Sequence, residues 1–146
     1  MAETKRADQI GTGEEFEPYE FRVTPEFNQQ YLDALDDHHP RYTQETVLGP
    51  PIVHPSLLLH QSNIPKSPSF YLPPGVSTIH SKEEVEHINP GRVGKTFTVH
   101  WKVVDMYEKR SRPYQVKEVL IVDEDGVEIL RRMVTDTFFT GRDDRE

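Results

Sequence analysis

The stretch that decides the fold is Ile52-Val53-His54-Pro55-Ser56-Leu57-Leu58-Leu59-His60-Gln61. Pro55 and Ser56 are typical of a helix start, where the missing N–H of proline costs nothing and a hydroxyl can accept a backbone hydrogen bond. The three consecutive leucines leave no polar face between them, so the helix should be buried nearly all round. We therefore predict a short buried helix, which the rest of the chain has to enclose.

Strand patterns fill the chain after Gly75. The clearest runs from Thr96 to Val103, where polar and apolar side chains alternate, as they do on a half-buried strand. Asp125-Gly126 favours a hairpin turn, because both residues tolerate positive φ values. We predict strands over residues 76–88, 96–103, 114–122 and 127–139.

The chain before the buried helix predicts one strand, one helix and a loop. Residues 19–23 alternate in the same way, and Thr24-Pro25 has the composition of a helix N-terminus. This first helix should end near Asp36, with one apolar face made of Phe27, Tyr31, Leu32 and Leu35. From Asp37 to Pro51, prolines and a glycine break regular structure, so this segment is predicted to be a loop.

These elements together predict an α+β protein. The simplest arrangement is one hotdog domain over residues 18–140, in which a curved antiparallel sheet wraps around the central helix. Residues 1–17 contain few large apolar side chains besides Ile10 and Phe16, so we expect a disordered N-terminal arm. Residues 141–146 are expected to form a charged C-terminal tail.

Composition excludes several classes of function. The net charge of −8 argues against nucleic acid as a partner, because a phosphate backbone requires a basic surface. There are no cysteines, which excludes thiolate nucleophiles and cysteine-ligated zinc. No apolar run approaches the ~20 residues of a membrane helix and no leader-like segment is visible, so a cytoplasmic protein without membrane partners is expected.

Three motifs resemble the MaoC-like hydratases and dehydratases. Residues 37–42, Asp-His-His-Pro-Arg-Tyr, look like the family loop D-x-N-P-x-H, and residues 49–55 look like the G-R-P-I-x-H-G segment that opens the central helix. Residues 79–94 resemble a later strand-and-turn motif of the family. The likeness covers roughly residues 18–140. It implies hydration of a 2-enoyl thioester, or dehydration of a 3-hydroxyacyl thioester, carried by coenzyme A or acyl carrier protein.

The resemblance assigns roles to individual residues. Asp37 occupies the position of the carboxylate that polarises the attacking water, but Tyr42 stands where the family has histidine. A phenol, with a reference pKa near 10, is a poor base at neutral pH, although it can orient water. His39 is a possible substitute for the missing imidazole. These three residues, Asp37, His39 and Tyr42, are the predicted catalytic set.

The start of the central helix is the predicted substrate-binding site. Backbone N–H groups there hold the thioester oxygen in the family. Pro55 has no N–H, so Ser56 and Leu57 would supply the donors. His54 either touches the thioester or is a satisfied core histidine. Ser56 is not in a G-x-S-x-G turn, so a serine hydrolase is not indicated.

Alternatives remain open at this point. Asp37 could simply form a turn, and His38 and His39 could be exposed loop side chains. Two adjacent histidines rarely bind one ion, so neither metal nor another cofactor is expected. The departures resemble N-terminal-type MaoC domains, which shape an acyl channel while a sister subunit carries the chemistry. A non-catalytic acyl-binding subunit and a hotdog thioesterase are therefore the alternative functions, and a homodimer or a heterodimer with a sister hotdog chain is expected.

Overall fold

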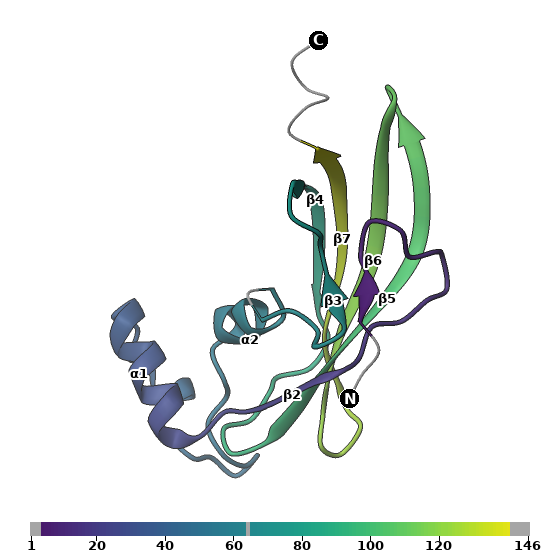
Figure 1. The fold of residues 1–146 in the computed structure, drawn as a ribbon. Coiled ribbons are helices and arrows are strands. Elements are labelled where there is room, and N and C mark those ends of the chain that lie inside the picture. Colours follow the sequence, from purple (N-terminus) through teal and green to yellow (C-terminus); the bar gives the residue numbers. More distant parts are fainter. Residues whose placement is uncertain (1–3, 64, 141–146) are drawn as a thin grey trace.

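The computed structural model describes residues 4–63 and 65–140 of the chain. Its main feature is a five-stranded antiparallel sheet in the order β2-β5-β6-β7-β4, which curls along its length (Figure 1). A short parallel pair, β1-β3, forms a second small sheet. The α+β class and the curved antiparallel sheet predicted from the sequence are confirmed.

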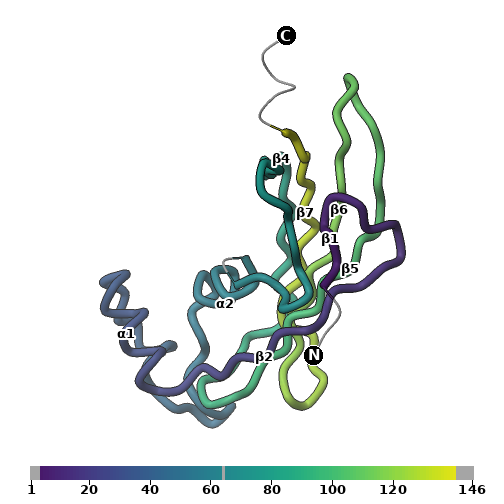
Figure 2. Tube along the Cα trace, viewed as in Figure 1, coloured from purple at the N-terminus to yellow at the C-terminus, as the bar shows by residue number. Residues whose placement is uncertain are grey.

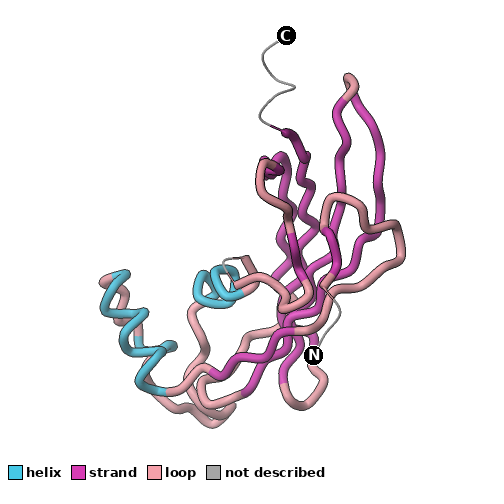
Figure 3. The backbone as a smooth tube through the Cα atoms, in the orientation of Figure 1, coloured by secondary structure: helices cyan, strands magenta, loops and turns pink. Residues whose placement is uncertain are grey.

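The predicted helices and long strands are present in the predicted order, and the short strands β1 and β3 and the turn η1 are additional (Figures 2 and 3). Their bounds are β1 Lys5–Arg6, β2 Tyr19–Arg22, α1 Pro25–Leu35, the 3-10 turn η1 Pro40–Tyr42, α2 Pro55–Gln61, β3 Phe70–Tyr71, β4 Val76–His87, β5 Thr96–Lys109, β6 Arg112–Asp123 and β7 Glu128–Thr140.

Strands β5 and β6 extend further than the sequence pattern indicated. The pairing register shifts between Val103 and Asp105, so the strict alternation is lost there although the strand continues. The two strands meet at a tight turn in which Arg110 and Ser111 have φ values of 52° and 64°. The basic residues around position 110 therefore belong to a hairpin end.

Helix α1 begins and ends at the residues that the sequence indicates. Thr24 caps it, because its side chain accepts a hydrogen bond from the Phe27 N–H at 3.1 Å. Asp36 ends it in the left-handed conformation, with φ 52°. The Asp37 N–H then donates to the Leu32 carbonyl at 3.1 Å. The end of α1 thus fixes the backbone of Asp37.

Helix α2 is buried against the curled sheet. Leu57 and Leu58 are 0% and 3% exposed and belong to the main apolar core. The turn after β4 passes so close that a Cβ on Gly91 would lie 3.1 Å from Leu58 and Phe97. At the other end of the helix, Arg132 of β7 donates to the Ser62 carbonyl at 2.9 Å. The predicted central helix is therefore present, but it is buried on one face only, since Pro55 and His60 are exposed.

The expectation of a disordered arm over residues 1–17 is wrong for residues 4–17. Ala7, Ile10 and Phe16 are at most 4% exposed and join the core. Backbone hydrogen bonds tie the segment to β5, from Gly13 N–H to the Val103 carbonyl and from Phe16 N–H to the Trp101 carbonyl. The apolar residues are too few and too unevenly spaced to form a recognisable pattern. They are buried where the segment runs along β5.

Two expectations concern the ends of the chain and its environment. The charged C-terminal tail, residues 141–146, and residues 1–3 lie outside the described residues. Among the residues that the structure describes, no helix combines the length and the apolar character needed to cross a membrane.

The burial of α2 can be tested with Leu58→Asp. An unpaired carboxylate in this core should lower the free energy of unfolding by about 3–5 kcal/mol, or prevent folding, as measured by chemical denaturation. Leu48→Asp is the matched control, because Leu48 is 79% exposed and its variant should unfold like the parent. Equal stability of the two variants would contradict the assignment of α2 to the core.

Candidate active site

The loop after α1 presents the carboxylate of Asp37 towards the start of α2. Its Oδ1 accepts a hydrogen bond from the His39 N–H at 3.2 Å, which closes a small turn over the carboxylate. Its Oδ2 lies 3.1 Å from Nε2 of His54. The side chain remains 39% exposed. Asp37 is therefore oriented from both sides and still accessible to water.

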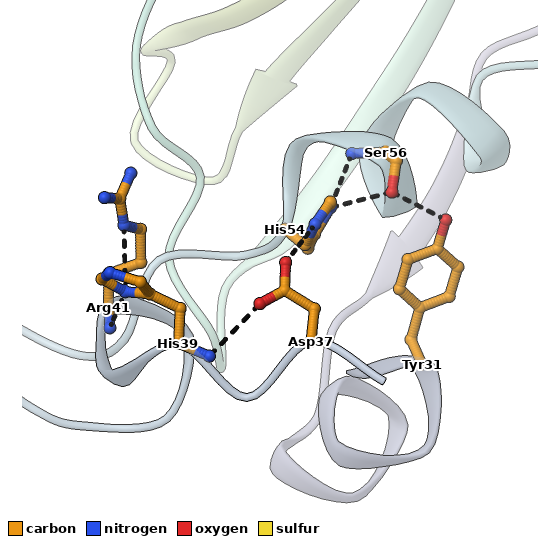
Figure 4. A network of polar contacts seen from close by, with 6 residues as sticks. All are labelled: Tyr31, Asp37, His39, Arg41, His54 and Ser56. Carbon is orange, nitrogen blue, oxygen red and sulfur yellow. Dashed lines mark hydrogen bonds and ion pairs between the residues drawn. The ribbon is translucent and has the colours of Figure 1, made fainter. Parts of the chain in front are cut away.

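His54 forms the N-cap of α2, and this capping role fixes its tautomer. The Ser56 N–H donates to Nδ1 of His54 at 3.1 Å. A nitrogen that accepts this bond carries no proton, so the neutral ring has its proton on Nε2. Nε2–H consequently donates to Asp37. The result is a hydrogen-bonded carboxylate–imidazole pair held between the end of α1 and the start of α2 (Figure 4).

Two hydroxyl groups extend this network. Ser56 Oγ lies 2.8 Å from Nδ1 of His54, and Tyr31 OH lies 3.0 Å from Ser56 Oγ. Because Nδ1 is an acceptor, the serine hydroxyl donates to it and can accept from Tyr31. Figure 4 shows Tyr31 reaching from α1 to the serine. The network thus runs Tyr31, Ser56, His54, Asp37 and joins both helices.

Tyr42 and His39 take positions that differ from their predicted roles. The Tyr42 ring packs on the His54 ring, with 4.8 Å between centroids, and its carbonyl accepts from Asn28 at 2.9 Å. The His39 ring turns to Arg41, whose backbone N–H and Nε both lie 3.2 Å from Nδ1 of His39. The imidazole bonded to Asp37 is therefore that of His54, and Tyr42 supports its face.

The predicted oxyanion donors are occupied. The Ser56 N–H is used by the His54 side chain, and the Leu57 N–H donates to the His54 carbonyl at 3.0 Å. The Leu57 side chain is fully buried in the core. Both N–H groups therefore have partners in the first turn of α2, and their role as donors to a substrate stays a prediction.

The pKa of Asp37 is lowered from its ordinary value. The largest cause is the hydrogen bond from the His39 N–H, and partial desolvation opposes it. The hydrogen bond and the charge interaction with His54 lower the pKa further. Asp37 is therefore ionised over the whole neutral range and available as a proton acceptor.

Tyr31 was predicted only as part of the apolar face of α1, and His54 only as a residue near the substrate or a core histidine. A signal for His54 was present in His54-Pro55-Ser56. A side chain with an acceptor before a proline at N1 can cap the following N–H groups. Nothing in the spacing indicated that Tyr31 reaches Ser56, since that contact depends on how the two helices pack.

A metal ion requires ligating side chains that lie close together. Within residues 4–63 and 65–140, no three His, Cys, Asp or Glu side chains gather in a way that could hold a metal ion.

Comparisons with known proteins identify the fold. No family model matches the chain, and no curated protein matches it in sequence. The MaoC-like dehydratase from Rhodospirillum rubrum matches with a TM-score of 0.73 and 16% identity, over 93% of this chain and 97% of the other. The (R)-hydratase from A. caviae, involved in PHA biosynthesis, matches with a TM-score of 0.66 and 17% identity, over 89% and 98%.

A third solved structure is a complex. The 3R-hydroxyacyl-ACP dehydratase HadBC from Mycobacterium tuberculosis matches with a TM-score of 0.58 and 14% identity, over 88% of this chain and 96% of the other. At such identities the likeness concerns the course of the backbone. The hotdog prediction is confirmed: the chain has the fold shared by MaoC-like dehydratases and (R)-hydratases.

Proposed function

We propose that the protein is a hydro-lyase that hydrates 2-enoyl thioesters, or dehydrates 3-hydroxyacyl thioesters in the reverse direction. The observation that carries the proposal is the 3.1 Å contact between Oδ2 of Asp37 and Nε2 of His54, at the start of the central helix of a hotdog fold. General acid–base catalysis requires such a pair within hydrogen-bond distance of a water and of the reacting carbon.

The Asp37–His54 pair can accept and return the one proton that hydration moves. Asp37 accepts a proton from water while the hydroxide adds to C3 of the enoyl thioester. The pair then returns one proton to C2, so that it ends each turnover in its starting protonation state. The negative charge that develops on the thioester oxygen needs a donor. We assign the hydroxyl of Tyr31 to it, which would turn from Ser56 Oγ to the substrate.

The proposal includes a second hotdog chain as partner, either a copy of this chain or a sister subunit. Strand β4 lies at the edge of the sheet, and nearly every one of its residues is exposed. A twelve-residue edge strand leaves a row of backbone groups ready to pair with another strand. The dehydratase complex that shares this fold supports this part of the proposal. The substrate is carried by coenzyme A or acyl carrier protein.

Thioester hydrolysis is the second candidate, and one distance favours it. Ser56 Oγ lies 2.8 Å from one nitrogen of His54 while Asp37 is bonded to the other, which is the order of groups used to activate a serine nucleophile. The product distinguishes the two reactions, because hydrolysis releases a free thiol and hydration does not. Binding without either reaction would instead support the acyl-binding subunit.

Asp37→Asn tests the proposed base. The amide keeps the shape of the side chain but cannot accept a proton from water, so kcat for hydration of an enoyl thioester should fall by about 100- to 10,000-fold. Asp36→Asn is the matched control, because the neighbouring Asp36 side chain is 98% exposed and its variant should retain activity. Tyr42→Phe should cost less than Asp37→Asn. Full activity in Asp37→Asn would contradict the assignment.

His54→Phe tests the pairing by pH titration. The pKa of Asp37 is lowered in part by His54, so loss of the imidazole should move it up, towards the ordinary value of about 3.9. Asp37 would then lose its charge earlier as the pH falls. NMR titration of the carboxyl carbon measures the change directly, and His38→Phe serves as control. An unchanged titration in His54→Phe would show that the two side chains do not pair in solution.

The edge of β4 predicts association. Sedimentation of the purified chain at micromolar concentration should give a dimer, because pairing of edge strands buries the exposed backbone groups. A monomer would exclude self-pairing and leave only the sister-subunit form of the proposal.

A further inference from the structure

A cavity of about 370 Å³ lies away from Asp37 and His54, which are absent from its lining. It is bounded by the segment after α2, by Phe16 of the N-terminal segment and by strands β4 to β7. One part of its wall is apolar and contains Phe70, Trp101 and Val134. Its volume is within the range of small-molecule sites, which begins near 300 Å³.

The other part of the wall is charged and largely buried. Lys117 and Arg132 are 7% and 2% exposed, and Asp136 is 8% exposed. Lys117 Nζ lies 3.3 Å from Asp136, and Arg132 pairs with Glu83. Burying charges costs several kcal/mol each even when they are paired. An apolar filling of the same space would avoid this cost, so the charges point to a function of the cavity.

The charges do not balance. Three cationic side chains line the cavity, Lys66, Lys117 and Arg132, against two carboxylates, Glu83 and Asp136. His80 lies between the carboxylates, at 3.1 Å from Glu83 and 3.7 Å from Asp136, and adds no negative charge. The lining therefore carries more cationic than anionic side chains.

Two of the cationic side chains, Lys66 and Lys117, lie beside the Phe70 ring. The ammonium groups of Lys66 and Lys117 lie 5.7 and 5.4 Å from the centroid of this ring. Among the described residues, Lys66 has no carboxylate within ion-pair distance. The pKa of Lys117 is lowered chiefly by burial, and repulsion from Lys66 and Arg132 contributes, while Asp136 opposes the shift. An anion near these two ammonium groups would offset the desolvation cost of the Lys117 charge. It would also offset the repulsion between Lys117 and Lys66.

We propose that this cavity is a second ligand site, which binds a small organic monocarboxylate. The carboxylate lies between Lys66 at the rim and Lys117 at the base, and an apolar body of a few carbon atoms packs on Phe70 and Trp101. The site shares no residue with the Asp37–His54 pair, so it goes beyond the proposed hydro-lyase function and does not depend on it.

Hexanoate and hexanamide are suitable probes because they differ in charge and hardly in shape. Trp101 is the only tryptophan of the chain and lines the cavity, so its fluorescence reports occupancy. Hexanoate should bind saturably to the chain of 146 residues. Hexanamide should bind at least about tenfold more weakly, since hydrogen bonds to a charged group are stronger than those to a neutral one. Equal affinity for both probes, or no saturable binding of hexanoate, would overturn the proposal.

Single substitutions test which charged side chains bind the carboxylate. Lys66→Gln changes an exposed side chain and should weaken hexanoate binding several-fold without affecting the fold. Lys117→Met should weaken it more strongly, and Asp136→Asn should tighten it, because a competing carboxylate is removed. Lys102→Gln, an exposed lysine of β5 outside the lining, is the matched control.

The outcomes are distinguishable even if one variant fails to fold. Should Lys117→Met be unstable, Lys66→Gln and Asp136→Asn still give opposite changes in affinity. Unchanged binding in Lys66→Gln, or weaker binding in a folded Asp136→Asn, would overturn the assignment of the carboxylate to this position. Asp37→Asn should bind hexanoate like the parent, which separates this site from the proposed reaction.

Discussion

The burial of α2 in the curl of the sheet is the constraint on which the rest of the structure depends. Leu57 and Leu58 fix the depth of a helix of only seven residues. Its first residues then meet the loop after α1, where His54 contacts Asp37. Its last residues meet Arg132, which reaches the Ser62 carbonyl. A short helix thus has a polar assembly at each end, one accessible to water and one inside a cavity.

The N-terminal segment contributes both to the core and to the cavity. Ile10 and Phe16 are each 4% exposed. Here these side chains complete the core, and Phe16 becomes part of the cavity wall. The cavity is therefore formed by segments far apart in the sequence, with β7 contributing Arg132 and Asp136 and the chain after α2 contributing Phe70.

The sequence predicts the elements well where local chemistry decides them. Thr24-Pro25 starts α1, the leucine run forms α2, and alternation identifies the strands, because each pattern depends on neighbouring residues. The N-terminal segment escaped prediction because isolated side chains such as Ile10 are buried by a surface that only the folded sheet creates. At the candidate site, Asp37 could be chosen from its loop motif. Its imidazole partner could not, because His39 is close in sequence while His54 is close in space.

The histidine cap of α2 has a consequence for how the site can change. One nitrogen of His54 holds the first turn of the helix through the Ser56 N–H, and the other holds Asp37. A second proton on the ring would occupy Nδ1 and turn an acceptor into a donor, so the backbone of Ser56 would lose its partner. The imidazole of His54 therefore serves both the proposed acid–base pair and the N-terminus of α2. If His54 were replaced and a histidine introduced elsewhere in the loop, the imidazole would be restored but the first turn of α2 would lose its cap.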